Sequence, residues 1–269
     1  MRLRIEHTTR FAYDAPVREA HAELRLRPLD AGGQRCLAFS LETEPPGPVR
    51  GYRDRHGNDV RSFECLPPHR ELVVTATSEV LTPDVFGDPE AGLSPLDAFD
   101  YLAPTSYAPQ GESVRAFAAP HEVPGKPLET ALALVQAVHT GLRYEKGATD
   151  VHTRADEALA RGRGVCQDFA HLLLASCRTL GIPGRYVSGY VLPGGDIGDQ
   201  AATHAWVDVF VTGVGWVSLD PTHGRQQSRQ HVRVAVGRDY GDAAPQRGSF
   251  KGDGDGEKPS VSLRVVRQQ

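Results

Sequence analysis

Several features that mark specialised protein classes are missing from this chain of 269 residues. No apolar run approaches the roughly 20 residues that a membrane-spanning helix requires. The first six residues alternate like a strand and do not form the apolar centre of a signal peptide. The formal net charge is only −4, which does not indicate a nucleic-acid or anionic-membrane partner. We therefore expect a cytoplasmic protein that binds neither nucleic acid nor membrane.

Cysteine is also scarce. None of the four cysteines has a partner at Cys-x-x-Cys spacing, so neither a zinc site nor a disulfide framework is indicated. The histidines show no metal-binding spacing either. The polar loops around Asp196 and Asp199 and at 253–257 lack a full calcium-loop pattern, which favours solvated turns. We expect no cofactor and no metal.

The remaining sequence changes character along its length. Residues 1–82 alternate between apolar and polar side chains with frequent Pro and Gly breaks, which predicts an antiparallel sheet. Residues 83–111 have the composition of a linker. Helical spacing follows at 113–119, 128–141, 154–161 and 166–180, and strand patterns follow at 185–191, 204–211, 216–220, 232–236 and 261–266. This order predicts an α+β protein with an N-terminal β domain at 1–105. A core at 106–269 carries the C-terminal strands.

One cysteine has an unusual position. Gly162 and Gly164 break a short helix, and Cys166 then falls in the first turn of the next, largely apolar one. Backbone N–H groups and the helix dipole stabilise a thiolate there. Cys177 lies on the same helix about 16 Å away, too far for a disulfide. We interpret Cys177 as a buried apolar residue and Cys166 as a candidate nucleophile, although a second buried thiol is the alternative.

The hairpin at 204–220 supplies candidate partners. His204 and Trp206 share one face of the first strand. A regular four-residue turn would place Asp220 on the opposite face from His204. A three-residue turn, or a bulge at Gly213 or Gly215, would place Asp220 across from Trp206 and diagonal to His204. We therefore predict a hairpin with an odd-length or bulged turn.

If Cys166, His204 and Asp220 meet, their roles follow from their chemistry. The histidine takes the thiol proton, the aspartate fixes its tautomer, and the thiolate attacks a carbonyl to form a thioester. The backbone N–H of Cys166 can stabilise the oxyanion, and Tyr144 is a candidate for a second donor. Gln167, Asp168 and Trp206 are expected to shape the site.

These motifs resemble a known family. Gly164-Val-Cys-Gln-Asp-Phe-Ala-His171, Gly181-Ile-Pro-Gly-Arg-Tyr-Val-Ser-Gly189, His204-Ala-Trp206 and Gly215-Trp-Val-Ser-Leu-Asp-Pro-Thr222 look like the bacterial transglutaminase-like family, within the papain-like cysteine peptidase superfamily. Residues 5–13 and 24–28 resemble its N-terminal β domain. The resemblance implies Cys166, His204 and Asp220 as the catalytic triad. His223 is a departure, because asparagine is expected more often there.

The expected activity is acyl transfer from an amide in a protein or peptide substrate. We favour hydrolysis, as in a cysteine protease or amidase, over amine transfer by a true transglutaminase. The sequence does not separate these reactions, which differ in whether water or an amine enters second. A non-catalytic binding module of the same fold is the other alternative.

Overall fold

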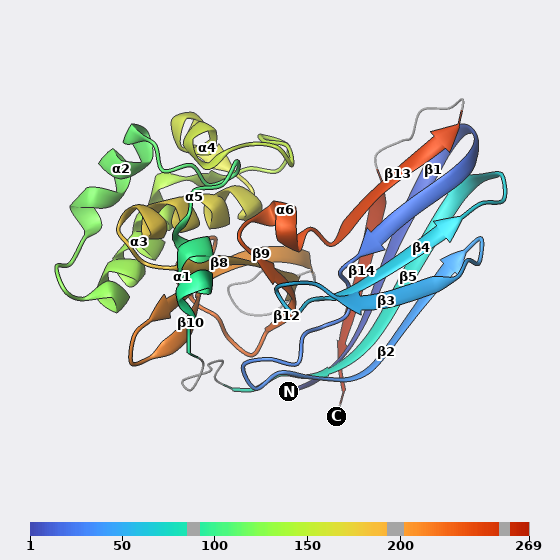
Figure 1. Cartoon of the computed structure of the whole chain (residues 1–269), viewed down its shortest axis with the longest axis horizontal. Coiled ribbons are helices and arrows are strands. Elements are labelled where there is room, and N and C mark those ends of the chain that lie inside the picture. The colour runs from blue at the N-terminus through green and yellow to red at the C-terminus, as the bar shows by residue number, and fades with distance from the viewer. Residues whose placement is uncertain (85–91, 193–201, 253–258, 269) are drawn as a thin grey trace.

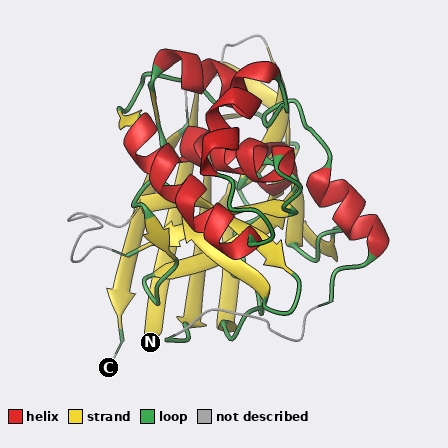
Figure 2. Cartoon of the chain, turned by 90° about the vertical axis from the view of Figure 1, so that its left-hand side faces the viewer, coloured by secondary structure: helices red, strands yellow, loops and turns green. Residues whose placement is uncertain are grey.

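The computed structural model has two parts that lie side by side (Figure 1). One is a core in which helices cover a sheet, and the other is a separate curled sheet. The structure describes residues 1–84, 92–192, 202–252 and 259–268. The helices gather on one side of the core, and Figure 2 shows them in front of the strands. Mixed α and β architecture with antiparallel sheets agrees with the fold class expected from the sequence.

The curled sheet is built around one long strand, β1 (Arg2–Leu24). On one edge of β1 lie β4 (Asp59–Cys65) and β5 (His69–Leu81), while β13 (Gln246–Gly252) and β14 (Ser260–Arg267) pair with the other edge. The outer strands are β2 (Arg35–Glu44), paired with β5, and β3 (Val49–Arg53), paired with β4. Apolar side chains of β1, β4 and β5 form the inner face.

The core consists of a five-stranded antiparallel sheet with helices packed against one face. The strands run in the order β11 (Arg225–Gln226), β10 (Gly215–Asp220), β9 (Ala202–Val211), β8 (Gly184–Val191) and β12 (His231–Gly237). The central helix is α5 (Cys166–Thr179), whose side chains are almost all buried, and it contacts β8 and β9. Around it lie α2 (Glu112–Ala118), η1 (Ala119–His121), α3 (Pro127–Gly141), α4 (Ala155–Arg161) and α6 (Tyr240–Ala243), with the short parallel pair β6 (Arg143–Tyr144) and β7 (Arg163–Gly164) beside them.

Two side-chain amides fix the two sheets to each other. β12 is an edge strand of the core sheet, so its outer backbone groups need partners from elsewhere. The buried amide of Gln34 donates to the Arg233 carbonyl (2.9 Å) and accepts from the Arg233 N–H (2.9 Å). Asn58 makes the same double contact with Val236, at 2.7 and 2.8 Å. Loops of the N-terminal sheet therefore complete the edge of the core sheet.

The structure corrects two parts of the predicted organisation. Within the predicted linker, α1 (Pro95–Leu102) is an ordered helix whose Tyr101 is buried and packs edge-on against Trp216. The C-terminal strands also divide: β12 joins the core sheet, whereas β13 and β14 join the N-terminal sheet. The prediction that the C-terminal strands belong to the core is therefore wrong for β13 and β14. The chain crosses between the two sheets more than once.

No helix in the described part of the chain is long and apolar enough to cross a membrane.

Candidate functional site

The start of α5 is held in place by the carboxylate of Asp168. Its Oδ2 accepts the backbone N–H of Val165 (2.7 Å) and the hydroxyl of Thr149 (2.6 Å). A Cβ atom at Gly164 would lie 2.5 Å from this oxygen, so only glycine fits there. Cys166 follows as the first residue of the helix, where backbone N–H groups have no acceptor within the helix. Asp168 thus shapes the loop that presents the thiol.

The hairpin has the register that the sequence predicted. Gly215 lies opposite Val211 and Leu219 lies opposite Val207, so the turn contains three residues, 212–214. Gly213 and Gly215 both have positive φ, at 81° and 89°, which other residues rarely adopt. Asp220 is therefore on the same face as His204 and diagonal to it. The prediction of an odd-length turn is confirmed.

His204 and Asp220 form a buried pair. Nε2 of His204 lies 2.8 Å from Oδ2 of Asp220, and the carboxylate has no exposed surface. Burial alone would lower the pKa of His204, but the charge and hydrogen bond of Asp220, together with the Cys166 thiol, outweigh it and raise that pKa to about 10. Burial disfavours the charged carboxylate too, yet its histidine partners hold the pKa of Asp220 well below its usual range. The structure thus brings the three predicted residues together.

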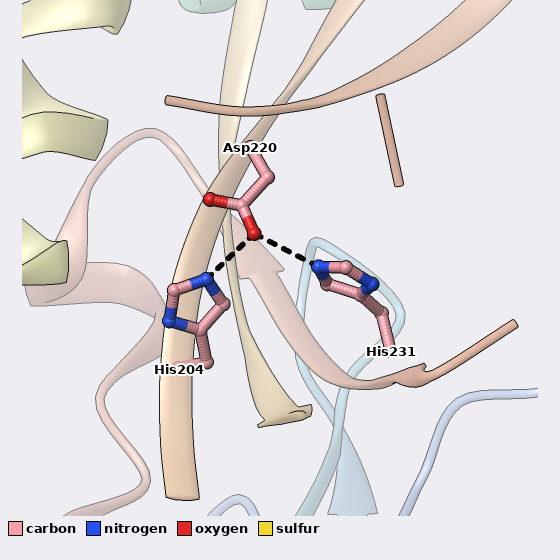
Figure 3. Close-up of side chains that lie close together, drawn as sticks. All are labelled: His204, Asp220 and His231. Atoms are coloured by element: carbon pink, nitrogen blue, oxygen red, sulfur yellow. Dashed lines mark hydrogen bonds and ion pairs between the residues drawn. The ribbon is translucent and has the colours of Figure 1, made fainter. Parts of the chain in front are cut away.

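Asp220 has two further histidine partners that the sequence did not indicate. Oδ2 lies 2.7 Å from Nδ1 of His223 and 2.9 Å from Nε2 of His231, while Oδ1 accepts the backbone N–H of Thr222 at 3.0 Å. Figure 3 shows Asp220 between His204 and His231. His223, the departure from the family pattern, thus contacts the carboxylate directly.

This cluster also has the composition of a metal site. One ligand atom each from His204, Asp220 and His231 lies within 4.8 Å of the others. Ligands bound to a tetrahedral zinc ion at about 2.1 Å are separated by roughly 3.4 Å. Here Oδ2 lies 2.8 and 2.9 Å from the two Nε2 atoms, which is the spacing of direct hydrogen bonds. These three residues as placed do not fit a bound metal.

A cleft of about 340 Å³ opens beside the thiol. The core contributes Cys166, Gln167 and His204 to its lining, and the N-terminal sheet contributes His7 and Thr9 of β1. Tyr186, Ser188, Thr203, Tyr240, Gln246 and Val261 complete most of the remaining wall. No Asp, Glu, Lys or Arg lines the described part of this cleft. The reactive groups therefore face a cleft whose described lining comes from both sheets and includes no Asp, Glu, Lys or Arg.

The other predicted site residues lie at different distances from this cleft. Gln167 lines it, and its amide donates to the Val151 carbonyl at 3.0 Å. Trp206 is fully buried beneath His204, with the two rings stacked at 6.1 Å. Tyr144 is half exposed, and both burial and the nearby Cys166 raise the pKa of its hydroxyl. An oxyanion role for Tyr144 remains a prediction. The acidic loops at 193–201 and 253–258 lie outside the described residues.

His171 is close to Cys166 in sequence but is turned away from the cleft. It is completely buried, its ring lies 5.0 Å from those of both Tyr107 and Tyr186, and Nε2 accepts the backbone N–H of Tyr240. Burial lowers its pKa to about 3, so the ring is neutral. His171 therefore contributes to packing behind the helix.

Comparisons with known proteins agree with this architecture. Residues 115–221 match the transglutaminase-like superfamily, and residues 3–81 match the bacterial transglutaminase-like N-terminal region. The chain is 36% identical to an uncharacterised protein of Mycobacterium leprae over 94% of both chains, and 33% identical to one of Mycobacterium tuberculosis over 98% of this chain and 92% of the other.

Among solved structures, a candidate cysteine protease from Cytophaga hutchinsonii superposes with a TM-score of 0.76 at 21% identity. The match covers 100% of this chain and 92% of the other. That degree of likeness shows a shared fold across both sheets. With the relatives and the family matches, it identifies this chain as a member of the bacterial transglutaminase-like family.

Proposed function

We propose that this protein catalyses cysteine-dependent acyl transfer from an amide, with hydrolysis as the main outcome. The observation that supports it most is the position of His204. Its Nε2 is bonded to buried Asp220, and its other side faces a cleft that Cys166 also lines. A raised His204 pKa favours the imidazolium that accompanies a thiolate. Cys166, His204 and Asp220 are the proposed catalytic residues.

The proposed reaction proceeds in two balanced halves. His204 accepts the thiol proton, the sulfur of Cys166 bonds to the carbonyl carbon, and the carbonyl oxygen becomes an oxyanion near the first N–H groups of α5. The imidazolium then protonates the departing amine as the C–N bond breaks and a thioester remains. Water, deprotonated by His204, attacks the thioester, and the acid and free thiol are released. An entering amine would instead give a new amide.

We infer a protein or peptide substrate from the composition of the cleft. Apart from the proposed Cys166–His204 pair, its described walls are polar or apolar and include no Asp, Glu, Lys or Arg, which suits an amide segment with neutral neighbours. Two separate sheets form these walls, so a substrate segment would contact β1 as well as the start of α5. All four cysteines are free, which supports a reducing compartment and thus the cytoplasm.

The proposal predicts hydrolysis of unstructured protein substrates that depends on Cys166. Wild type should release new amino termini from denatured casein, whereas Cys166→Ala should lose at least about 10³-fold in rate. A parallel reaction containing a labelled primary amine measures transfer. Amine uptake without hydrolysis would reverse our order of preference and favour a true transglutaminase, and no Cys166-dependent reaction of either kind would favour a binding module.

Alkylation by iodoacetamide provides a test without a substrate. Cys166 should react between pH 5 and 8, while Cys177 should not, because burial raises the pKa of the Cys177 thiol to about 12 and the side chain has no exposed surface. Peptide mapping by mass spectrometry gives the rate at each cysteine. Cys36 is a partly exposed internal control whose pKa burial also raises. Equal rates at Cys166 and Cys36 would contradict an activated thiolate.

A further inference from the structure

His231 reaches the proposed catalytic carboxylate from a different part of the sheet. It begins β12, an edge strand, whereas His204 and Asp220 lie on β9 and β10 at the other side of β8. Its side chain is completely buried, and its Nε2 lies 2.9 Å from Oδ2 of Asp220 (Figure 3). A fully buried histidine that is bonded to a catalytic candidate but does not line the cleft calls for a role in positioning.

The contact with Asp220 places a proton on Nε2 of His231. Ionised Asp220 can only accept, so Nε2 must be the donor. Nδ1 lies 3.2 Å from the backbone N–H of Ser228, which donates, and 3.3 Å from the Ser228 carbonyl oxygen, which accepts. Burial lowers the pKa of His231 and favours the neutral ring, whose single proton is then the one on Nε2.

Packing holds the ring in this orientation. Trp206 lies edge-on to His231 at 5.2 Å and also stacks on His204. Room for the indole exists because position 189 is glycine: a Cβ there would lie 2.6 Å from the Trp206 ring. Trp206 thus supports both histidines from below. The groups that face Asp220 are then His204 from β9, His223 from the loop after β10, and His231 from β12.

We propose that His231 is a positioning residue, a neutral donor that keeps Oδ2 of Asp220 directed at Nε2 of His204. The backbone N–H groups of Thr222 and His223 hold Oδ1, so the direction of Oδ2 depends on the histidine side chains around it. His223 also donates to Oδ2, but its side chain is 18% exposed, so water can replace it. His231 is fully buried, and nothing can substitute for its N–H. Loss of this donor weakens support for the imidazolium of His204, which lowers the reactivity of Cys166.

The test compares two amide side chains of different length at position 231, glutamine and asparagine. In His231→Gln the side-chain nitrogen can occupy the place of Nε2, whereas in His231→Asn it is one methylene too short. We expect the rate of Cys166 alkylation by iodoacetamide at pH 6.5 to fall about 10- to 100-fold in His231→Asn and His231→Leu. His231→Gln should stay within about threefold of wild type. His223→Asn, which restores the residue typical of the family, should change the rate less than tenfold.

This inference rests on the proposed function, but the two can fail separately. If Cys166 of the wild type reacts no faster than Cys36, the proposed function fails. If Cys166 is fast in the wild type and equally fast in His231→Leu, only the positioning role is overturned. An equal fall in the Cys166 alkylation rate in His231→Gln and His231→Asn, with native far-UV circular dichroism for both, would also overturn the positioning role. The position of the side-chain N–H would then make no difference.

Discussion

Replacing Asp220 by asparagine should lower kcat/KM for amide hydrolysis by about 10³- to 10⁴-fold, comparable to the loss of the aspartate in other nucleophile–His–Asp sites. Three imidazole nitrogens lie within 2.9 Å of Oδ2. If the amide oxygen takes this place, the negative charge is lost. If the amide nitrogen takes this place, its N–H groups face the N–H groups of the histidines and no hydrogen bond can form. In either arrangement the imidazolium of His204 loses its support.

The same variant should change the pH profile in a defined direction. In the wild type, Asp220 and Cys166 outweigh burial and raise the pKa of His204 to about 10, so the imidazolium and the rate should persist until the pH approaches 10. Without the carboxylate charge, Cys166 alone opposes burial, so the pKa of His204 falls and the alkaline limb moves below its wild-type position. The raised pKa of His204 also stabilises the folded protein. This contribution to the free energy of unfolding is fully present below pH 6.5 and is lost as the pH rises through about 10.

Hydrolysis rates measured from pH 5 to 10.5 follow this limb, because the imidazolium must protonate the departing amine. Asp84→Asn is the matched control, because its carboxylate is 82% exposed and pairs only with the exposed Arg229 in the described structure. It should leave the profile unchanged. An alkaline limb at the same pH in wild type and Asp220→Asn would show that Asp220 does not support the imidazolium.

The hairpin shows how much of the site can be predicted from sequence. Strand alternation and turn parity are local properties, and two glycines in a short turn already favour an odd loop. They were sufficient to place Asp220 on the face of His204. The start of α5 was equally accessible, since glycines and apolar spacing mark it within a few residues.

Other features were not accessible because they depend on long-range pairing. The long strand β1 continues through Asp14-Ala-Pro16, with a register shift between Ala12 and Val17 in its pairing with β5. His231 is eleven residues beyond Asp220 at the start of an apolar strand, and no spacing connects the two. Its role follows only from the strand order, which places β12 beside β8.

Asp208 shows the limit of the alternation argument in another way. It shares a strand face with His204 and is as acidic as Asp220, so composition alone does not separate the two carboxylates. The structure does so by their partners. Oδ1 of Asp208 accepts from Arg233 at 2.7 Å and from the Ser218 hydroxyl at 2.6 Å, and Oδ2 accepts from Arg185 at 3.0 Å. Asp208 thus binds two arginines and no histidine, which indicates a structural role.

Asp208→Ala should therefore reduce the free energy of unfolding by about 3–5 kcal/mol, because it removes the carboxylate from a guanidinium that is itself buried. Arg233 is only 4% exposed, whereas Arg185 also lies over the Trp216 ring at 4.1 Å and keeps that contact. Urea unfolding followed by circular dichroism measures the change, and Asp208→Asn, which retains an acceptor oxygen, should lose less.

The double variant Asp208→Leu with Arg233→Met decides whether the charge or the volume matters. If the loss in Asp208→Ala reflects the buried Arg233 guanidinium without its carboxylate, removing Asp208 and Arg233 together while filling the space should recover most of the stability. Neither of these two ions then has to be desolvated, and Arg185 keeps its contact with the Trp216 ring. If the double variant is as unstable as the sum of its single changes, the pair itself stabilises the hairpin. The alkylation rate of Cys166 in the recovered variant then shows whether this ion pair also maintains the alignment of His204 four residues away.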